Sequence, residues 1–270
     1  MHLEYKVRLP DHDWVVGNRH KLIPSVYTAV LIKPDGMGRE DAVSYAGPTF
    51  IGVRSGKHSS STAATHAKDF KRMLELPDFD PFLKTESGKL KPVLIFTVDG
   101  GPDENPRYPK TINYAVQHFL DHDADGIFIA TNAPGQSKYN RCERIMSRLT
   151  KEMSMLVIPH DTFGNHLDAD GNTIDEELEL KNFGHAGRVL AEVWSGLVIN
   201  NFNVVSEYQE PDEELPSLRD ISPAWYVEHV RESQYMVQVR FSTLFALLET
   251  HAVASNAKFV HLYFTDYQVR

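Results

Sequence analysis

Short apolar runs closed by glycine or proline mark the middle of the chain. Residues 93–98 (VLIFTV) stop at the turn sequence DGGP, and residues 126–131 (GIFIAT) stop shortly before a second proline-glycine pair. Such runs are typical of buried strands. Between them, residues 111–120 carry apolar side chains at helical spacing, which predicts a helix. Strand, helix and strand form a crossover unit, so we expect the two strands to be parallel.

Other segments extend this pattern to a mixed α/β chain. Alternation and apolar runs predict further strands at residues 3–9, 26–32, 49–53 and 257–267. Helical spacing predicts helices at residues 59–76, 140–146, 175–201, 223–239 and 241–251. Within the third of these helices, a break near Gly184 or Gly187 is an open alternative. An acidic stretch with two prolines, residues 209–216, is typical of a linker. We therefore expect one α/β domain over residues 1–208 and a mostly helical extension over residues 209–270.

Composition limits the class of protein. The chain has 270 residues, of which 41% are hydrophobic and 24% charged, as is usual for a globular protein. No apolar run has the length of a membrane span, and the first residues lack the apolar core of a signal peptide. A single cysteine, Cys142, excludes an internal disulfide framework and favours a reducing compartment. We therefore expect an intracellular protein, nuclear or cytoplasmic, that is not secreted and has no membrane partner.

The formal net charge of −9 disfavours indiscriminate binding to nucleic acid. That affinity comes mainly from neutralisation of phosphates by lysine and arginine. Two local basic groups are present, within residues 54–72 and 138–151. Each is either a local basic face for nucleic acid or a solvated helix face, and the solvated face is the simpler interpretation.

Acidic residues after the two central strands are the leading candidates for chemistry. Asp99 follows the first strand, and Glu143 lies in the first turn of the helix after the second. Ligands and catalytic groups gather outside the carboxyl ends of parallel strands. Carboxylates there can hold Mg²⁺ or Mn²⁺, and two such ions can activate an attacking oxygen and stabilise the leaving oxygen of a phosphodiester. The structural alternative is that Asp99 caps a turn and Glu143 faces solvent.

Residues 133–144 (APGQSKYNRCER) resemble the signature of mariner-like DDE transposases, which belong to the ribonuclease H-like superfamily. In that signature, a proline-containing loop leads through an asparagine, here Asn140, to the last catalytic glutamate and a basic residue. The order of the predicted elements is also similar to the ribonuclease H-like fold, a mixed sheet of an antiparallel meander and parallel strands flanked by helices. Residues 1–239 as a whole resemble transposon-derived proteins of invertebrate and fungal genomes.

This resemblance implies a DNA partner and metal-dependent DNA strand cleavage and transfer. Asp99 and Glu143 would be the catalytic residues and would bind Mg²⁺ or Mn²⁺. Lys138 and Arg144 would lie near DNA phosphates.

The resemblance is incomplete at the first catalytic aspartate of the family, which lies on the first core strand. Residues 3–9, 26–32 and 49–53 contain no aspartate. We therefore expect the first strand to lie upstream of residue 1 and the activity of this chain to be impaired. Asp103, Asp11 and Asp13 are the candidates for a third metal ligand. The alternative is a catalytically inactive protein that binds nucleic acid or another protein.

Overall fold

The computed structural model describes residues 21–32, 43–44, 47–133, 142–154, 156–211, 218–241 and 259–266. The strands are β1 (Leu22–Ile32), β2 (Val43–Ser44), β3 (Thr49–Ser55), β4 (Val93–Val98), β5 (Gly126–Thr131), β6 (Val198–Ile199), β7 (Phe202–Tyr208), β8 (Val230–Glu232), β9 (Met236–Arg240) and β10 (Phe259–Asp266). The helices are α1 (Ala63–Glu75), α2 (Asp80–Leu83), α3 (Pro109–Asp121), α4 (Cys142–Met153), α5 (Glu176–Ser195) and α6 (Pro223–His229), with a 3-10 turn, η2 (Pro77–Phe79).

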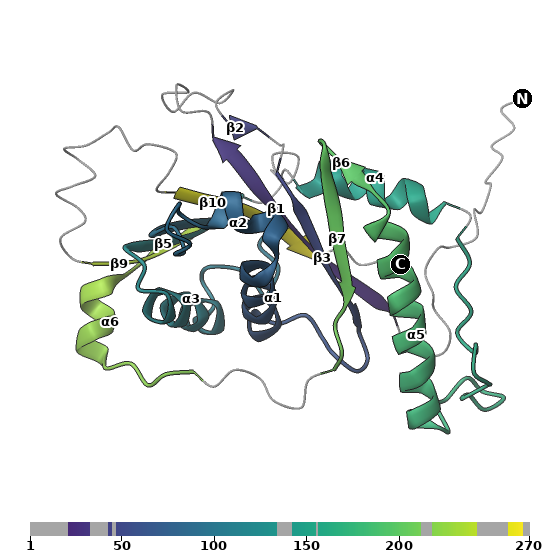
Figure 1. Ribbon diagram of the computed structural model, residues 1–270. Helices are drawn as coiled ribbons and strands as arrows, with labels where there is room; N and C mark the ends of the chain where they lie inside the picture. The colour runs from purple at the N-terminus through teal and green to yellow at the C-terminus, as the bar shows by residue number, and fades with distance from the viewer. Residues whose placement is uncertain are drawn as a thin grey trace, which may run out of the picture.

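The ten strands form a mixed sheet with helices on both faces (Figure 1), which confirms the predicted mixed sheet flanked by helices. The strand order is β6-β7-β3-β1-β10-β4-β5-β9-β8, and β2 pairs with β1. β10, β4 and β5 run parallel, whereas β1 is antiparallel to both β10 and β3. The predicted crossover from β4 through α3 to β5 is confirmed. β10 joins the half of the sheet that contains β1 to the half that contains β4.

Local sequence explains where α1 and α3 begin and end. The Thr62 side chain accepts a hydrogen bond from the Thr65 backbone N–H, and the Thr65 side chain accepts one from Thr62 in return. This reciprocal cap starts α1. The helix ends before Pro77, because the residue before a proline favours an extended backbone, as Leu76 has. Pro109 starts α3 at a position where no backbone donor is needed.

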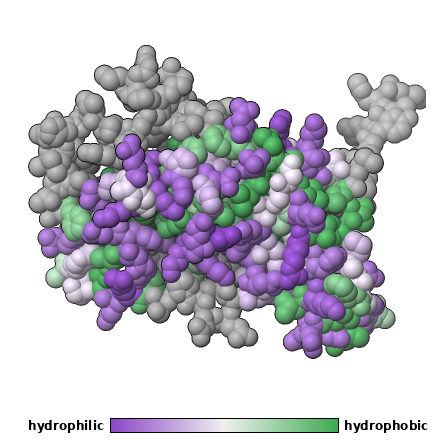
Figure 2. Space-filling model, in the orientation of Figure 1, coloured by the Kyte–Doolittle hydropathy of each residue, from purple (hydrophilic) through white to green (hydrophobic). Residues whose placement is uncertain are grey.

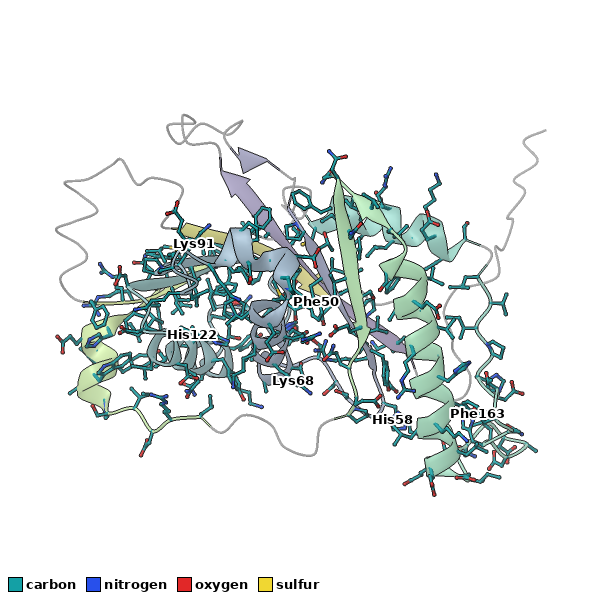
Figure 3. All side chains as sticks on the ribbon, in the orientation of Figure 1. Phe50, His58, Lys68, Lys91, His122 and Phe163 are labelled. Carbon is teal, nitrogen blue, oxygen red and sulfur yellow. The ribbon has the colours of Figure 1, made fainter. Side chains whose placement is uncertain are left out.

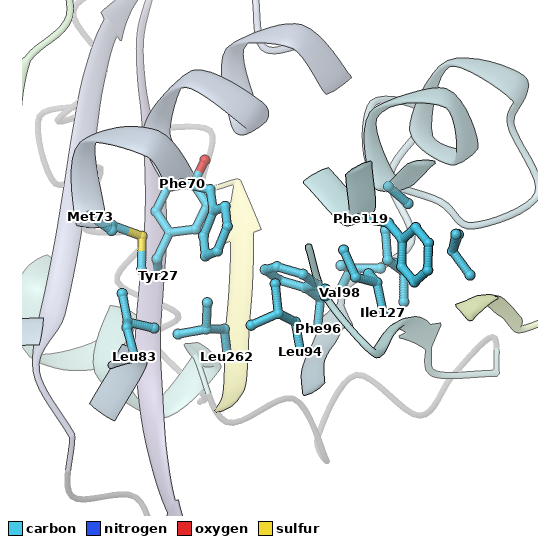
Figure 4. Close-up of a cluster of buried hydrophobic side chains, with 14 of the residues drawn as sticks. Tyr27, Phe70, Met73, Leu83, Leu94, Phe96, Val98, Phe119, Ile127 and Leu262 are labelled. Atoms are coloured by element: carbon cyan, nitrogen blue, oxygen red, sulfur yellow. The ribbon is translucent and has the colours of Figure 1, made fainter. Parts of the chain in front are cut away.

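Alternation along β1 divides the buried side chains into two cores. Tyr27 and Ala29 pack in one core with side chains of α1 and α3, including Phe70 and Phe119 (Figure 4). Leu22 and Val26 pack in the second core with side chains of α4 and α5. Successive residues of a strand point to opposite faces of a sheet, so α1 and α3 cover one face and α4 and α5 the other.

The predicted helix over residues 175–201 is too long by half a dozen residues, but it is not broken at Gly184 or Gly187. Helix α5 runs through both glycines and ends at Ser195. Asn200 and Asn201 then adopt positive φ angles of 52° and 69° in the turn between β6 and β7. Asparagine is among the residues that tolerate this conformation. β7, which was not predicted, pairs in parallel with β3.

The predicted helix over residues 223–239 is wrong beyond His229. Its second half forms β8 and β9, an antiparallel pair at the edge of β5 in which Val230, Val237 and Val239 are buried. β-branched side chains favour this pleated environment. β10 confirms the predicted strand over residues 257–267. In the described residues after Tyr208, β8, β9 and β10 thus all belong to the sheet. The described part of residues 209–270 is therefore not mostly helical. The predicted strand over residues 3–9 and the predicted helix over 241–251, except Phe241, lie outside the described residues.

Stability should depend on pH through His118 of α3, which lies against Phe70 and near His122 (Figure 3). Burial, and then the neighbouring His122, lower the pKa of His118 to about 3. The unfolded chain has the ordinary histidine pKa of about 6.5. The folded state therefore excludes a proton that the unfolded state binds, so the stabilisation is complete above pH 6.5 and decreases as the pH falls towards 3. We expect this group to remove about 2 kcal/mol from the free energy of unfolding between pH 6.5 and 5. Urea unfolding of the wild type and His118→Gln at both pH values measures it, and equal losses in the two proteins would contradict this assignment.

Candidate active site

The carboxyl ends of β10, β4 and β5 meet at one edge of the sheet. Phe264 is level with Val98, and Val98 is level with Thr131. Asp266 is the last residue of β10, and Asp99 directly follows β4. The sheet therefore places two acidic residues on neighbouring parallel strands at this edge, where ligands gather in parallel sheets.

The loop after β4 is fixed by a buried carboxylate. Glu104 is 2% exposed, and its Oε1 accepts hydrogen bonds from the backbone N–H groups of Asp99, Gly100 and Gly101 at 3.1, 3.2 and 3.4 Å. Three converging N–H groups suit a negatively charged oxygen. Gly100 has a φ of +94°, and a Cβ there would lie 2.5 Å from Oγ1 of Thr131, so the position requires glycine. The loop presents Asp99, which is exposed, at a defined place.

Asp99 also caps a turn, which is the structural alternative that the sequence left open. Its Oδ1 accepts a hydrogen bond from the Gly101 backbone N–H at 2.9 Å, which closes a local turn. This contact orients the carboxylate and does not bury it. Turn capping and metal binding through this carboxylate are therefore compatible.

Helix α4 lies on the face of the sheet opposite to α1 and α3, and it begins near the carboxyl ends of β10 and β4. Cys142 is buried, and its Sγ lies 3.7 Å from the backbone oxygen of Val26. Val26 is level with Thr265, the residue before Asp266. The first turn of α4, which carries Glu143, therefore lies against β1 at the level where β10 and β4 end. Close approach of the Asp99 and Glu143 carboxylates stays a prediction, because the Glu143 side chain lies outside the described part of the structure.

Of the remaining predicted site residues, the structure describes the side chain of Asp103. Asp11, Asp13 and Lys138 lie outside the described residues, as does the side chain of Arg144. The Oδ2 atom of Asp103 lies 3.2 Å from Nε2 of His66, so this carboxylate already contacts a side chain of α1.

Asp266 was not among the predicted site residues. Alternation over residues 257–267 predicts the strand that ends at Asp266. The same pattern does not show that this strand pairs with β4. Among the side chains that the structure describes, no three histidine, cysteine, aspartate or glutamate residues are placed to hold a metal ion. That set does not include the side chains of Glu143 and Asp266.

A second buried polar cluster lies where β3 ends, around Glu179 in the first turn of α5; Figure 3 labels one of its members, His58. Its carboxylate is 3% exposed and accepts hydrogen bonds from Nζ of Lys57 and from Oγ1 of Thr173. Nε2 of His58 lies 3.1 Å from the same carboxylate. Burial lowers the pKa of His58, although Glu179 opposes this shift. The cluster ties the loop before α5 to the end of β3.

His166 adjoins this cluster but is not arranged as a metal ligand. Asn182 accepts a hydrogen bond from the Phe163 N–H through Oδ1 and donates one to the Gly164 oxygen through Nδ2. The same Nδ2 lies 3.1 Å from Nδ1 of His166, so Nδ1 accepts and the neutral ring carries its proton on Nε2. A protonated Nε2 facing Glu179 at 3.8 Å has no lone pair for a metal ion.

Hydrophilic residues cover most of the described surface on the side shown in Figure 2, with smaller groups of hydrophobic residues between them. None of the helices in the described residues combines the length and the apolar character needed to cross a membrane. In comparisons with known proteins, no family model matches the chain, and no curated protein or solved structure matches it. The geometry of the sheet edge is therefore the basis for assigning a function.

Proposed function

We propose that the carboxyl edge of the sheet is a divalent-metal site for DNA strand cleavage of the kind found in DDE transposases. The observation that carries this proposal is that parallel neighbours β10 and β4 end side by side at Asp266 and Asp99. The directions of β3, β1, β10, β4 and β5 agree with an antiparallel meander followed by parallel strands. In this proposal, β10, which lies between β1 and β4, takes the place of the first core strand, in contrast to the expectation that this strand lies upstream of residue 1.

The chemistry follows from the acidic residues at this edge. Asp99, Glu143 and Asp266 would supply oxygen ligands, which Mg²⁺ and Mn²⁺ prefer. Two ions held there would activate a water or 3′-hydroxyl for attack on the phosphorus and would stabilise the leaving oxygen of the broken phosphodiester bond. Lys138 and Arg144 would contact phosphates of the DNA.

The activity of this chain is expected to be low. A net charge of −9 repels DNA at long range, so encounter depends on low ionic strength. The proposal therefore requires two measurements, metal binding by the protein alone and nicking of DNA. Metal binding without nicking would favour the second candidate, a catalytically inactive protein that binds nucleic acid or another protein.

Titration of Mn²⁺ by calorimetry and nicking of supercoiled plasmid in Mn²⁺ test the proposal. We expect Asp99→Asn and Glu143→Gln each to weaken Mn²⁺ binding at least about tenfold, because each removes one charged ligand. We expect both variants to abolish nicking. Asp266→Asn tests whether β10 supplies the third ligand.

Asp125→Asn is the matched control. Asp125 is exposed and directly precedes β5. It therefore lies at the amino end of this strand, whereas the proposed site lies at the carboxyl end. Its replacement makes the same change in net charge far from the proposed site. If all the variants bind Mn²⁺ as the wild type does, or if Asp125→Asn weakens binding as much as Asp99→Asn, the metal site is not at this edge.

A further inference from the structure

A continuous chain of polar side chains, all buried except the half-buried Asp103, leads from β3 to the loop that carries Asp99. The guanidinium of Arg54 forms a buried ion pair with the carboxylate of Asp69. The Tyr27 hydroxyl donates a hydrogen bond to Oδ2 of Asp69 at 2.6 Å and lies 2.6 Å from Nδ1 of His66. On the other side of the ring, Nε2 of His66 lies 3.2 Å from Oδ2 of Asp103. The chain thus connects the interior of the sheet to the loop after β4.

Both nitrogens of the His66 ring have a polar contact. Nδ1 faces the Tyr27 hydroxyl, and Nε2 faces the carboxylate of Asp103. A second side chain contacts Nε2 of His66, because Oγ of Ser61 also lies 3.2 Å from it. From its place on α1, the ring therefore bridges β1 and the loop after β4.

We propose that His66, through its contact with Asp103, holds the loop that presents Asp99. His66 is therefore a positioning residue for the proposed metal site. Asp103 is directly followed by Glu104, whose carboxylate binds the N–H groups of Asp99, Gly100 and Gly101. Fixing Asp103 thus fixes the residue that shapes the turn. The effect on metal binding rests on the proposed function, whereas the contact of His66 with the loop does not.

The packing beside this loop is interrupted. A cavity of about 50 Å³ adjoins His66, Asp103 and Glu104 and extends between α1 and α3. Free space beside a loop permits it to shift, because no side chains there resist the movement. The contact between His66 and Asp103 crosses from α1 to the loop beside this cavity, so its loss should loosen the turn.

Hydrogen exchange tests the positioning role. We expect His66→Gln to speed exchange of the Gly100 and Gly101 amides at least about tenfold, after correction for any change in global stability measured with urea. His118→Gln is the matched control, because His118 lines the same cavity without contacting Asp103 in the described hydrogen bonds. His66→Gln/Asp103→Asn, in which one amide can donate to the other, should restore much of the protection. Unchanged exchange in His66→Gln, or equal acceleration in the control, would overturn the positioning role.

Metal titration separates this inference from the proposed function. If the wild type binds Mn²⁺ and the proposal holds, His66→Gln binds it more weakly although it retains Asp99. If the wild type binds no Mn²⁺, the proposed function fails, while amide exchange still decides the role of His66.

Discussion

Asp69→Ala is expected to lower the free energy of unfolding by about 3–5 kcal/mol, the cost of removing one partner from a buried ion pair. The side chains of Arg54 and Asp69 are 1% and 0% exposed. Without Asp69, the Arg54 guanidinium remains buried with its charge uncompensated, and the Tyr27 hydroxyl loses its acceptor. Urea unfolding at pH 7 measures the loss.

Two further variants test whether burial of the ion pair causes this loss of stability. Arg188 and Glu210 form an ion pair whose side chains are 58% and 61% exposed, so Glu210→Ala should cost less than about 1 kcal/mol. Arg54→Met/Asp69→Leu should recover a large part of the stability, because apolar side chains of similar size leave no buried charge. If Asp69→Ala costs no more than Glu210→Ala, the ion pair does not stabilise the fold as the structure indicates.

Gly187→Ala is expected to destabilise the protein by about 1–3 kcal/mol through overpacking. Alanine in the middle of a helix ordinarily stabilises by up to about 1 kcal/mol relative to glycine, so the expected sign is reversed. A Cβ at residue 187 would lie 2.2 and 2.5 Å from ring carbons Cδ2 and Cε2 of Tyr208. The ring has little freedom to withdraw, because Tyr208 ends β7 beside β3 and the Arg188 guanidinium lies 5.3 Å from the ring centroid. Burial also raises the pKa of Tyr208 to about 12.

Gly184→Ala is the matched control on the same helix. The nearest atom to a Cβ there is Nη1 of Arg188 at 3.2 Å, the far end of a flexible side chain, and the Tyr208 ring lies 3.7 Å away. We expect this variant to be neutral or to stabilise by up to about 1 kcal/mol. Urea unfolding of both variants gives the comparison, and a stabilised Gly187→Ala would refute the close packing of α5 on β7.

These two glycines show where sequence reasoning about the fold succeeds and where it ends. Apolar spacing predicts the helix, since a repeat every three to four residues reflects one buried face. The same sequence suggests a break at the glycines, because glycine weakens an isolated helix. Their actual role depends on β7, whose approach to α5 is a tertiary contact that no local pattern shows. The helix predicted over residues 223–239 fails for a related reason, because pairing with β5 favours strands there.

The candidate site is predictable to a similar degree. Asp99 is identifiable because it directly follows an apolar strand and precedes two glycines that permit a tight turn. Glu104 gives no such signal, because its role arises only when the loop folds back on its own N–H groups. Asp266 and His66 depend on strand register and on contacts between elements far apart in the chain. Sequence therefore locates the loop and the edge, whereas the contacts that hold them require the fold.

The central position of β10 has a consequence for how the protein folds. In the described sheet, β10 pairs with β1 and β4, which would otherwise each present an open edge to solvent. Ser25 pairs with Asp266, near opposite ends of the chain, so closing the centre of the sheet requires contacts of very large sequence separation. Such contacts form slowly, because the entropy of a long intervening chain must be lost first. Until β10 arrives, the unpaired edges of β1 and β4 are open to strands of other molecules, so refolding should compete with association.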